Sequence, residues 1–270
     1  MALYLQSNTA ALNAENYFNT SNNAINSDFT QLSSGYRINS AADDAAGLGI
    51  AKAMNAQVQS YTVAGQNAND GISMVQTADG SADQIDSLLT SMRSLAVEAQ
   101  NGTMSSNDTA NLATVFNQDL AEINRVAGDA TFNGATLLAG AATTVSFQVG
   151  INGTSNDQIS VSFGGCDASG LGISNITITS ATVLTSIDSA MQTLDNNRAG
   201  FGAAMDRLQD ASTQISSTQT NLSSALSTIQ DVDVASATAD LAREQVLAQA
   251  GASVLSQANQ APQLALKLLQ

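Results

Sequence analysis

The sequence predicts a mainly α protein, a long antiparallel helical bundle or coiled coil interrupted by a small β-hairpin. Three observations support this fold class. The 270 residues include a single proline, whereas soluble proteins average about 5%, so almost nothing interrupts a helix. Apolar residues recur at heptad spacing over long stretches, which is typical of packed helices. One short region near the middle of the chain instead alternates apolar and polar residues, as a β-strand does.

The two ends of the chain carry weak heptad stripes. Apolar residues recur every seven positions, at Ala11, Phe18, Ile25 and Leu32 near the N-terminus and at Val234, Leu241, Ala248 and Leu255 near the C-terminus. Such stripes are marginal as isolated helices, so we expect the ends to pack against each other or against neighbouring copies.

A longer stripe predicts a helix that ends at Asn101-Gly102-Thr103. Ser40, with Asp43 three residues later, is a capping-box pattern that predicts the start of this helix. A glycoside-type acid and base pair at Asp43 and Asp44 is a weaker interpretation, because local caps are the common cause of such patterns. The seam positions are Met54, Val58, Tyr61, Ile72, Val75, Leu89 and Met92.

Two further helices follow. Ser105 and Asp108 form a second capping box, and the helix that they open has its seam at Leu112, Phe116, Leu120 and Ile123. The strongest periodicity begins at Ile187 and predicts one helix over residues 185–231, about 70 Å long. Its seam, in which Arg198 takes one position, contains Met191, Leu194, Phe201, Met205, Leu208, Ile215, Leu222, Leu226 and Ile229.

The period-two region lies between the helical halves. Val145, Phe147 and Val149 alternate with polar residues, as do Ile159, Val161 and Phe163, and a Gly-, Asn- and Ser-rich connection separates them. This pattern predicts a β-hairpin. The apolar residues from Leu171 to Ile178 are candidates for its continuation.

Composition excludes several classes of function. The chain has no histidine, so neither a Ser/His/Asp triad nor an HExxH zinc site can form, and we expect no enzyme and no cofactor. The formal net charge of −15 disfavours nucleic acid as a partner. No apolar run is long enough to span a membrane, and the first residues lack the pattern of a cleavable signal peptide.

Charge is distributed unevenly along the chain. Residues 1–42 and 233–270 each carry a net charge of −1, which leaves most of the negative charge between them. We therefore expect the ends to face protein and the middle to face water. Asp231 and Asp233 lack the other residues of a calcium loop and predict a helix break. Cys166 has no basic neighbour, which favours an unreactive loop thiol over a reactive surface thiol.

Several segments closely resemble bacterial flagellins. They are SSGYRINSAADDAAGLGIAKAM at 33–54, NANDGISMVQTA at 67–78, MRSLAVEAQNGT at 92–103, EINRVAGDATFNGATLL at 122–138 and QAGASVLSQANQAPQLALKLL at 249–269. These motifs occur in the family's order, and the resemblance spans about residues 1–140 and 185–270.

The resemblance implies a division of the chain into domains. Residues 1–42 and 233–270 would form an inner coiled-coil domain in which both ends pair, and 43–140 with 185–232 would form an outer helical bundle. Residues 141–184 leave room for the hairpin and little more, so the chain looks like a short flagellin without the outermost domains.

The resemblance also implies a function. The chain would polymerise with itself into the extracellular flagellar filament and transmit motor torque for swimming. Its other partners would be the export apparatus with a chaperone, the filament cap and the hook-junction proteins. The subunit contacts expected in the inner domain are Leu5, Ala11, Phe18, Ile25, Phe29, Leu32, Val234, Leu241, Ala248 and Leu255.

One segment of flagellins is recognised by an innate immune receptor of animal hosts. Well-recognised members carry an arginine and a glutamate where this chain has Ser91 and Val115. Arg93 and Leu95 are retained, but without the two charged groups we do not expect strong recognition.

Two other functions remain open at this point. A hook-filament junction protein shares the terminal pattern, although such relatives diverge from the motifs above. The chain could also be a secreted coiled-coil adhesin or immune ligand whose polymerisation is incidental.

Overall fold

The structure, a computed structural model, describes residues 7–268 and is mainly helical within them. Its helices are α1 (Thr9–Ser34), α2 (Ala45–Ala99), α3 (Ser106–Asp129), α4 (Val183–Gln230) and α5 (Val234–Leu268). The strands form two antiparallel pairs, β1 (Thr131–Phe132) with β2 (Ala135–Thr136) and β3 (Thr143–Gln148) with β4 (Gln158–Phe163). This confirms the predicted fold class. None of the described helices is long and apolar enough to cross a membrane.

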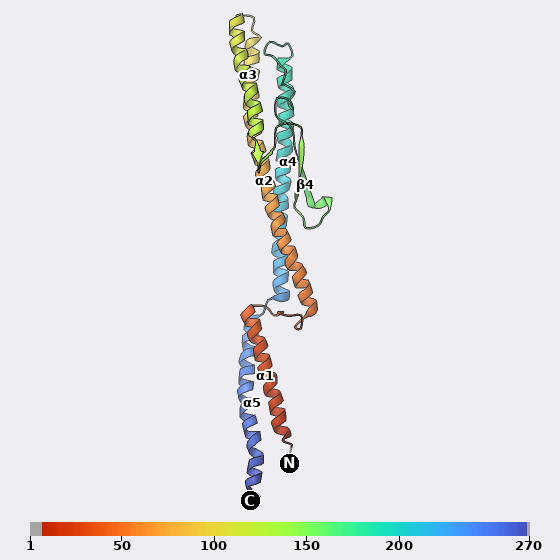
Figure 1. The fold of residues 1–270 in the computed structure, drawn as a ribbon, viewed down its shortest axis with the longest axis vertical. Coiled ribbons are helices and arrows are strands. Elements are labelled where there is room, and N and C mark those ends of the chain that lie inside the picture. The colour runs from red at the N-terminus through yellow and green to blue at the C-terminus, as the bar shows by residue number, and fades with distance from the viewer. Residues whose placement is uncertain (1–6, 269–270) are drawn as a thin grey trace. The chain divides into compact units, whose positions relative to one another are not determined.

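The chain forms two compact units, one from residues 1–56 and 221–270 and the other from 57–220. In the first unit α1 and α5 lie side by side (Figure 1). The Asn8 side chain donates to the Ala258 carbonyl at 2.9 Å, and at the other end of the pair Tyr36 bridges to Asp231. Residues early in α1 thus meet residues late in α5, so the two chain ends pair in an antiparallel manner.

The start of α2 differs from the prediction. Asp43 does accept hydrogen bonds from the Ser40 amide and hydroxyl, but this pair closes a turn that precedes the helix. The helix itself begins at Ala45, and its cap is Asp44, which accepts a hydrogen bond from the Gly47 amide at 2.9 Å. The prediction of Ser40 as the N-cap was wrong because two capping patterns overlap and the later one closes the first helical turn.

The predicted boundaries of the next elements are confirmed. Ser105 and Asp108 form the expected capping box at the start of α3. The break expected at Asp231 and Asp233 separates α4 from α5, and Asp233 accepts a hydrogen bond from the Ala235 amide at the start of α5.

In the second unit, α3 and parts of α2 and α4 lie side by side (Figure 1). Side-chain pairs that join α2 to α4 include Thr62 with Gln219, Asp79 with Arg198 and Arg93 with Asp188. As the residue number rises along α2, the number of its partner on α4 falls. The two helices are therefore antiparallel and keep one register over the length of the unit.

The core of this unit lies where the hairpin meets the helices. Along β4 the buried residues alternate, at Ile159, Val161 and Phe163. The Phe163 ring lies 5.6 Å from the Phe201 ring of α4, centroid to centroid. On the helices, Leu89, Met92, Phe116, Ile123 and Leu194 are fully buried.

The segment after β4 is not a strand. Leu171, Ile173 and Ile178 are buried, but residues 171–178 form turns and coil. Gly172 has a φ of 73°, which breaks an extended run. The predicted continuation of the sheet was therefore wrong, because the apolar spacing reflects burial of a coiled segment against the helices.

The short β1–β2 hairpin was not anticipated. Its turn is Asn133-Gly134, and both residues have positive φ. Asn-Gly is a strong sequence signal for a two-residue hairpin turn, so this element could have been found.

Candidate functional site

The buried positions in the contact between α1 and α5 hold small residues, and the larger residues beside them are half-buried. The buried positions are Ala14 and Ser21 on α1 and Ala237 and Ala248 on α5. On the same side, Gly251 of α5 lies against Phe18. Small side chains let the helices approach closely, but they bury little apolar surface.

The residues expected to make subunit contacts lie beside these buried small residues. Ala248 is buried, and Phe29 and Val234 are exposed at 53% and 59%. The half-buried members are Ala11, Phe18, Ile25, Leu32, Leu241 and Leu255. Leu5 lies outside the described residues. Most of the heptad stripe therefore faces the contact between α1 and α5, leaving only part of each side chain exposed.

Large apolar side chains project from other faces of the pair. Tyr17 is 76% exposed and Val246 is 65% exposed, and Leu12, Leu247 and Val254 are also exposed. The heptad analysis missed these residues because they lie off the stripe. In the sequence they are visible only as large apolar residues outside the heptad positions.

These side chains lie on more than one face. Tyr17, Leu247 and Val254 line a groove of about 430 Å³ along the pair, together with Ala14 and Gly251. Leu12 lies two residues before the buried Ala14 and Val246 two before the buried Ala248, about 200° around each helix. The pair is therefore apolar both in the groove and on the sides away from it, which is typical of an interaction surface.

The seam residues of the bundle differ in burial. Those that are buried are Val75, Leu89, Met92, Phe116, Ile123, Leu194, Phe201, Leu208 and Ile215. Those that are half-buried are Met54, Val58, Tyr61, Ile72, Leu112, Leu120, Met191, Met205, Leu222, Leu226 and Ile229. The buried group belongs entirely to the compact unit of residues 57–220.

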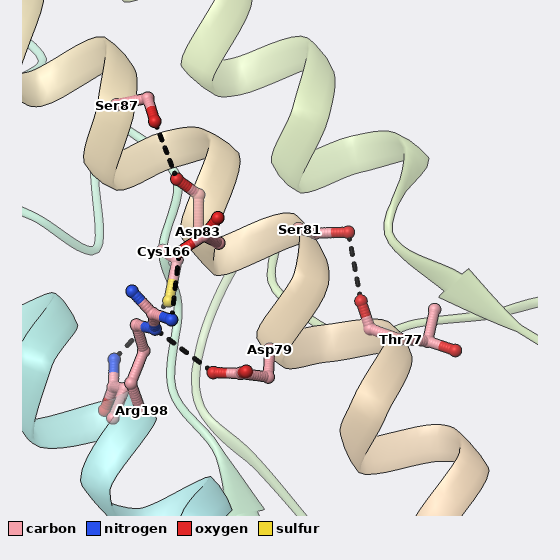
Figure 2. Close-up of polar contacts among 8 residues, drawn as sticks. Thr77, Asp79, Ser81, Asp83, Ser87, Cys166 and Arg198 are labelled. Atoms are coloured by element: carbon pink, nitrogen blue, oxygen red, sulfur yellow. Dashed lines mark hydrogen bonds and ion pairs between the residues drawn. The ribbon is translucent and has the colours of Figure 1, made fainter.

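Arg198 takes a seam position of α4 but carries a charge. Figure 2 shows its guanidinium between two carboxylates of α2, with Nε 3.1 Å from Asp79 Oδ1 and Nη2 3.0 Å from Asp83 Oδ1. The hydrogen bond to Asp79 raises the pKa of Arg198 above its ordinary value. The sequence showed the charge at this position but not its partners, which come from another helix.

Cys166 lies near this ion pair (Figure 2). Its thiol is buried and accepts a long hydrogen bond of 3.5 Å from the Asn197 side chain. Burial raises the pKa of the Cys166 thiol, which keeps it protonated and poorly nucleophilic. The structure favours the unreactive thiol and shows that it is not on the surface.

The segment around Ser91, for which the resemblance implied recognition by an immune receptor, makes polar contacts within the bundle. The Ser91 hydroxyl donates to Asp119 Oδ2 at 3.0 Å, and Arg93 Nε lies 2.7 Å from Asp188 Oδ1. Leu95 packs against the core, whereas Val115 is 44% exposed. The structure thus places Ser91 on the surface of α2 and Val115 on the surface of α3.

No group of three or more potential ligands among the described residues is arranged to hold a metal ion. The arrangement that the chain offers is a set of apolar surfaces on paired helices, which is suited to binding protein.

Comparison with known proteins gives consistent matches to one family. The bacterial flagellin N-terminal helical region matches residues 5–143, and the C-terminal helical region matches residues 184–269. A flagellin of Halalkalibacterium halodurans is 36% identical over 99% of this chain and all of its own. A flagellin of Bacillus subtilis is 32% identical over 97% of this chain and 98% of its own.

A third relative, the flagellar filament 33 kDa core protein of Treponema phagedenis, is 30% identical over 99% of this chain and all of its own. A solved structure of Bacillus cereus flagellin aligns with 60% of this chain and 94% of its own, at 27% identity and a TM-score of 0.47. Both family regions and full-length relatives thus agree, and the chain belongs to the bacterial flagellin family.

Proposed function

We propose that this chain is a structural subunit that polymerises into the bacterial flagellar filament and transmits motor torque for swimming. The observation that carries the proposal is the α1–α5 pair, which buries small residues and leaves large ones such as Tyr17 and Val246 exposed. Full-length similarity to flagellins, including a filament core protein, supports the same function.

The apolar surfaces of the pair suit an open polymer. The groove lined by Tyr17, Leu247 and Val254 differs from the sides that carry Leu12 and Val246. A contact between two different surfaces is repeated by each added copy, and it builds an open helical filament when the rotation between copies does not close a ring. Full burial of each large apolar side chain would contribute about 1.5–3 kcal/mol.

The distribution of charge supports an inner position for the ends. Residues 1–42 and 233–270 each carry a net charge of −1, against −15 for the whole chain. Nearly neutral helices can pack among copies of themselves at a small electrostatic cost, whereas the acidic remainder favours contact with water. We assign these end segments to the inner domain of the filament.

The partners and location follow from this function. We expect export of the unfolded chain through the flagellar apparatus with a chaperone, folding beneath the filament cap, and a junction to the hook. The protein would then be extracellular and would keep its N-terminal region. The one cysteine is free and buried, so no disulfide has to form after export.

Electron microscopy after precipitant-induced assembly tests the proposal. Long uniform tubes are the expected result. Isolated rods or rings would contradict the filament function and favour a junction protein or a secreted adhesin.

A further inference from the structure

The two linkers that lead into and out of the α1–α5 pair are themselves paired. One joins α1 to α2 and the other joins α4 to α5, and both lie in the first compact unit. The Arg37 amide donates a hydrogen bond to the Gln230 carbonyl at 2.7 Å. The Val232 amide donates in the opposite direction, to the Gly35 carbonyl at 3.0 Å. The two linkers therefore form a short antiparallel ladder.

The side chain of Arg37 makes a further contact with the end of α4. Its guanidinium Nη2 donates to the Ile229 carbonyl at 2.5 Å, and Ile229 lies in the last turn of that helix. The last four carbonyls of a helix have no partner within it, and the negative end of the helix dipole favours a cation. Arg37 is the only basic residue in 1–42, so no other side chain of this segment can supply that cation.

The next residue, Ile38, is fixed to the start of α2. Its side chain is 2% exposed, and a Cβ added at Gly47 would lie 2.7 Å from Ile38 Cδ1. Any larger residue at Gly47 would clash at this distance, so glycine is what lets the linker approach the helix closely. Arg37 thus contacts α4 while Ile38 contacts α2, and two consecutive residues of the first linker touch both helices.

The chain passes between the α1–α5 pair and the other helices only through these two linkers. Unpaired linkers could each rotate about their own φ and ψ bonds, whereas hydrogen bonds between them restrict both to moving together. We propose that residues 35–38 and 229–232, here named the linker clamp, hold the start of α2 to the end of α4 and transmit twist to the α1–α5 pair through both linkers at once, with Arg37 as the positioning residue. The transfer of motor torque rests on the proposed function, but the pairing of the linkers does not.

Cross-linking of the full-length chain tests the clamp directly. Tyr36 faces Asp231 between the two backbone hydrogen bonds, where opposed Cα atoms lie about 4.5 Å apart, and a disulfide spans about 4.4–6.8 Å. Tyr36→Cys with Asp231→Cys should therefore form an intrachain disulfide under a mild oxidant, identified by peptide mass spectrometry. The reaction is run with and without precipitant, because the ends are expected to become ordered on assembly.

Variants of Arg37 in this background test its role. Arg37→Ala should slow disulfide formation roughly two- to tenfold, the range for the loss of one net hydrogen bond. Arg37→Lys keeps a cationic donor and should slow it less. Filaments of Arg37→Ala with native residues at 36 and 231 should dissociate at a lower temperature, and the disulfide between positions 36 and 231 should restore the midpoint. Failure to restore it would overturn the role assigned to Arg37.

Arg243→Ala is the matched control, because it removes an arginine of the same unit whose ion pairs, in the described part of the chain, are with its own helix. It should leave the cross-linking rate unchanged. The proposal is overturned if no disulfide joins positions 36 and 231 in either condition, if Arg37→Ala does not slow its formation, or if Arg243→Ala slows it equally. A disulfide that depends on Arg37 in a chain that assembles no filaments would support the clamp and contradict the proposed function.

Discussion

Arg198 and Asp79 join α4 to α2 through a 3.1 Å contact, and the arginine stands in line with the apolar residues of its helix. A charged residue can occupy this position because Asp79 and Asp83 of α2 lie opposite it. The contact between Arg198 and Asp79 thus indicates the register in which α2 and α4 pack.

Arg198→Ala should lower the free energy of unfolding by about 1 kcal/mol, since it leaves two carboxylates without their cation in a partly buried site. Urea denaturation measures this change. Arg125→Ala is the control, because the carboxylates that Arg125 pairs with in the described part of the chain, Glu122 and Asp129, belong to its own helix. Equal effects of the two variants would show that Arg198 has no special part in the register.

Gly71 marks the place where the hairpin touches α2. A Cβ there would lie 3.1 Å from Phe147 and 3.2 Å from Leu208, so Gly71→Ala should crowd this contact and destabilise the unit by roughly 1 kcal/mol. Gly80→Ala meets nothing within 4 Å and should instead stabilise the helix by about 0.5–1 kcal/mol. Thermal denaturation of both variants checks the opposite signs, and a shared sign would contradict the packing described here.

The cap of α3 should make stability depend on acid pH. Hydrogen bonds from the Ser105 hydroxyl and amide hold the pKa of Asp108 below 3.8. A lowered pKa contributes stability above the ordinary value, and this contribution is lost as the pH falls through the lowered one. Asp108→Asn should therefore lower the thermal midpoint at neutral pH, and the difference should shrink as the pH falls below the ordinary value of 3.8. A difference that stays constant with pH would rule out this role of the carboxylate.

Placing charged residues at positions 91 and 115 should raise activation of the innate immune receptor that recognises flagellins. The change is Ser91→Arg with Val115→Glu, because charge-assisted contacts are stronger than neutral ones. Asp119 already lies 3.0 Å from the Ser91 hydroxyl and offers a carboxylate to an arginine at this position. A cell reporter assay compares the two proteins, and strong signalling by the unmodified chain would defeat the argument.

The fold was predictable where periodicity is strong. The α4 seam from Met191 to Ile229 and the alternation in β4 follow from local pattern alone. The pattern failed at Ser40, where two capping signals overlap, and after β4, where Leu171 and Ile173 are buried without pairing as a strand. Local pattern reports burial, but it does not report which backbone groups bond to each other.

The candidate site was only partly predictable. Heptad spacing identified residues such as Phe18 and Leu241 that face the α1–α5 contact. It missed Tyr17 and Val254, because exposure depends on where the partner helix lies.

The most direct test of the central claim, that the two ends make the polymer contacts, is electron microscopy of a chain lacking residues 1–42 and 233–270, with circular dichroism to monitor its fold. We expect the ends to be disordered or marginal in the free subunit and to become helical only on polymerisation, because burial then offsets the entropy of ordering. The truncated chain should remain soluble and helical and should form no filaments. Filaments from the truncated chain, or loss of its helical signal, would show that the contacts lie elsewhere.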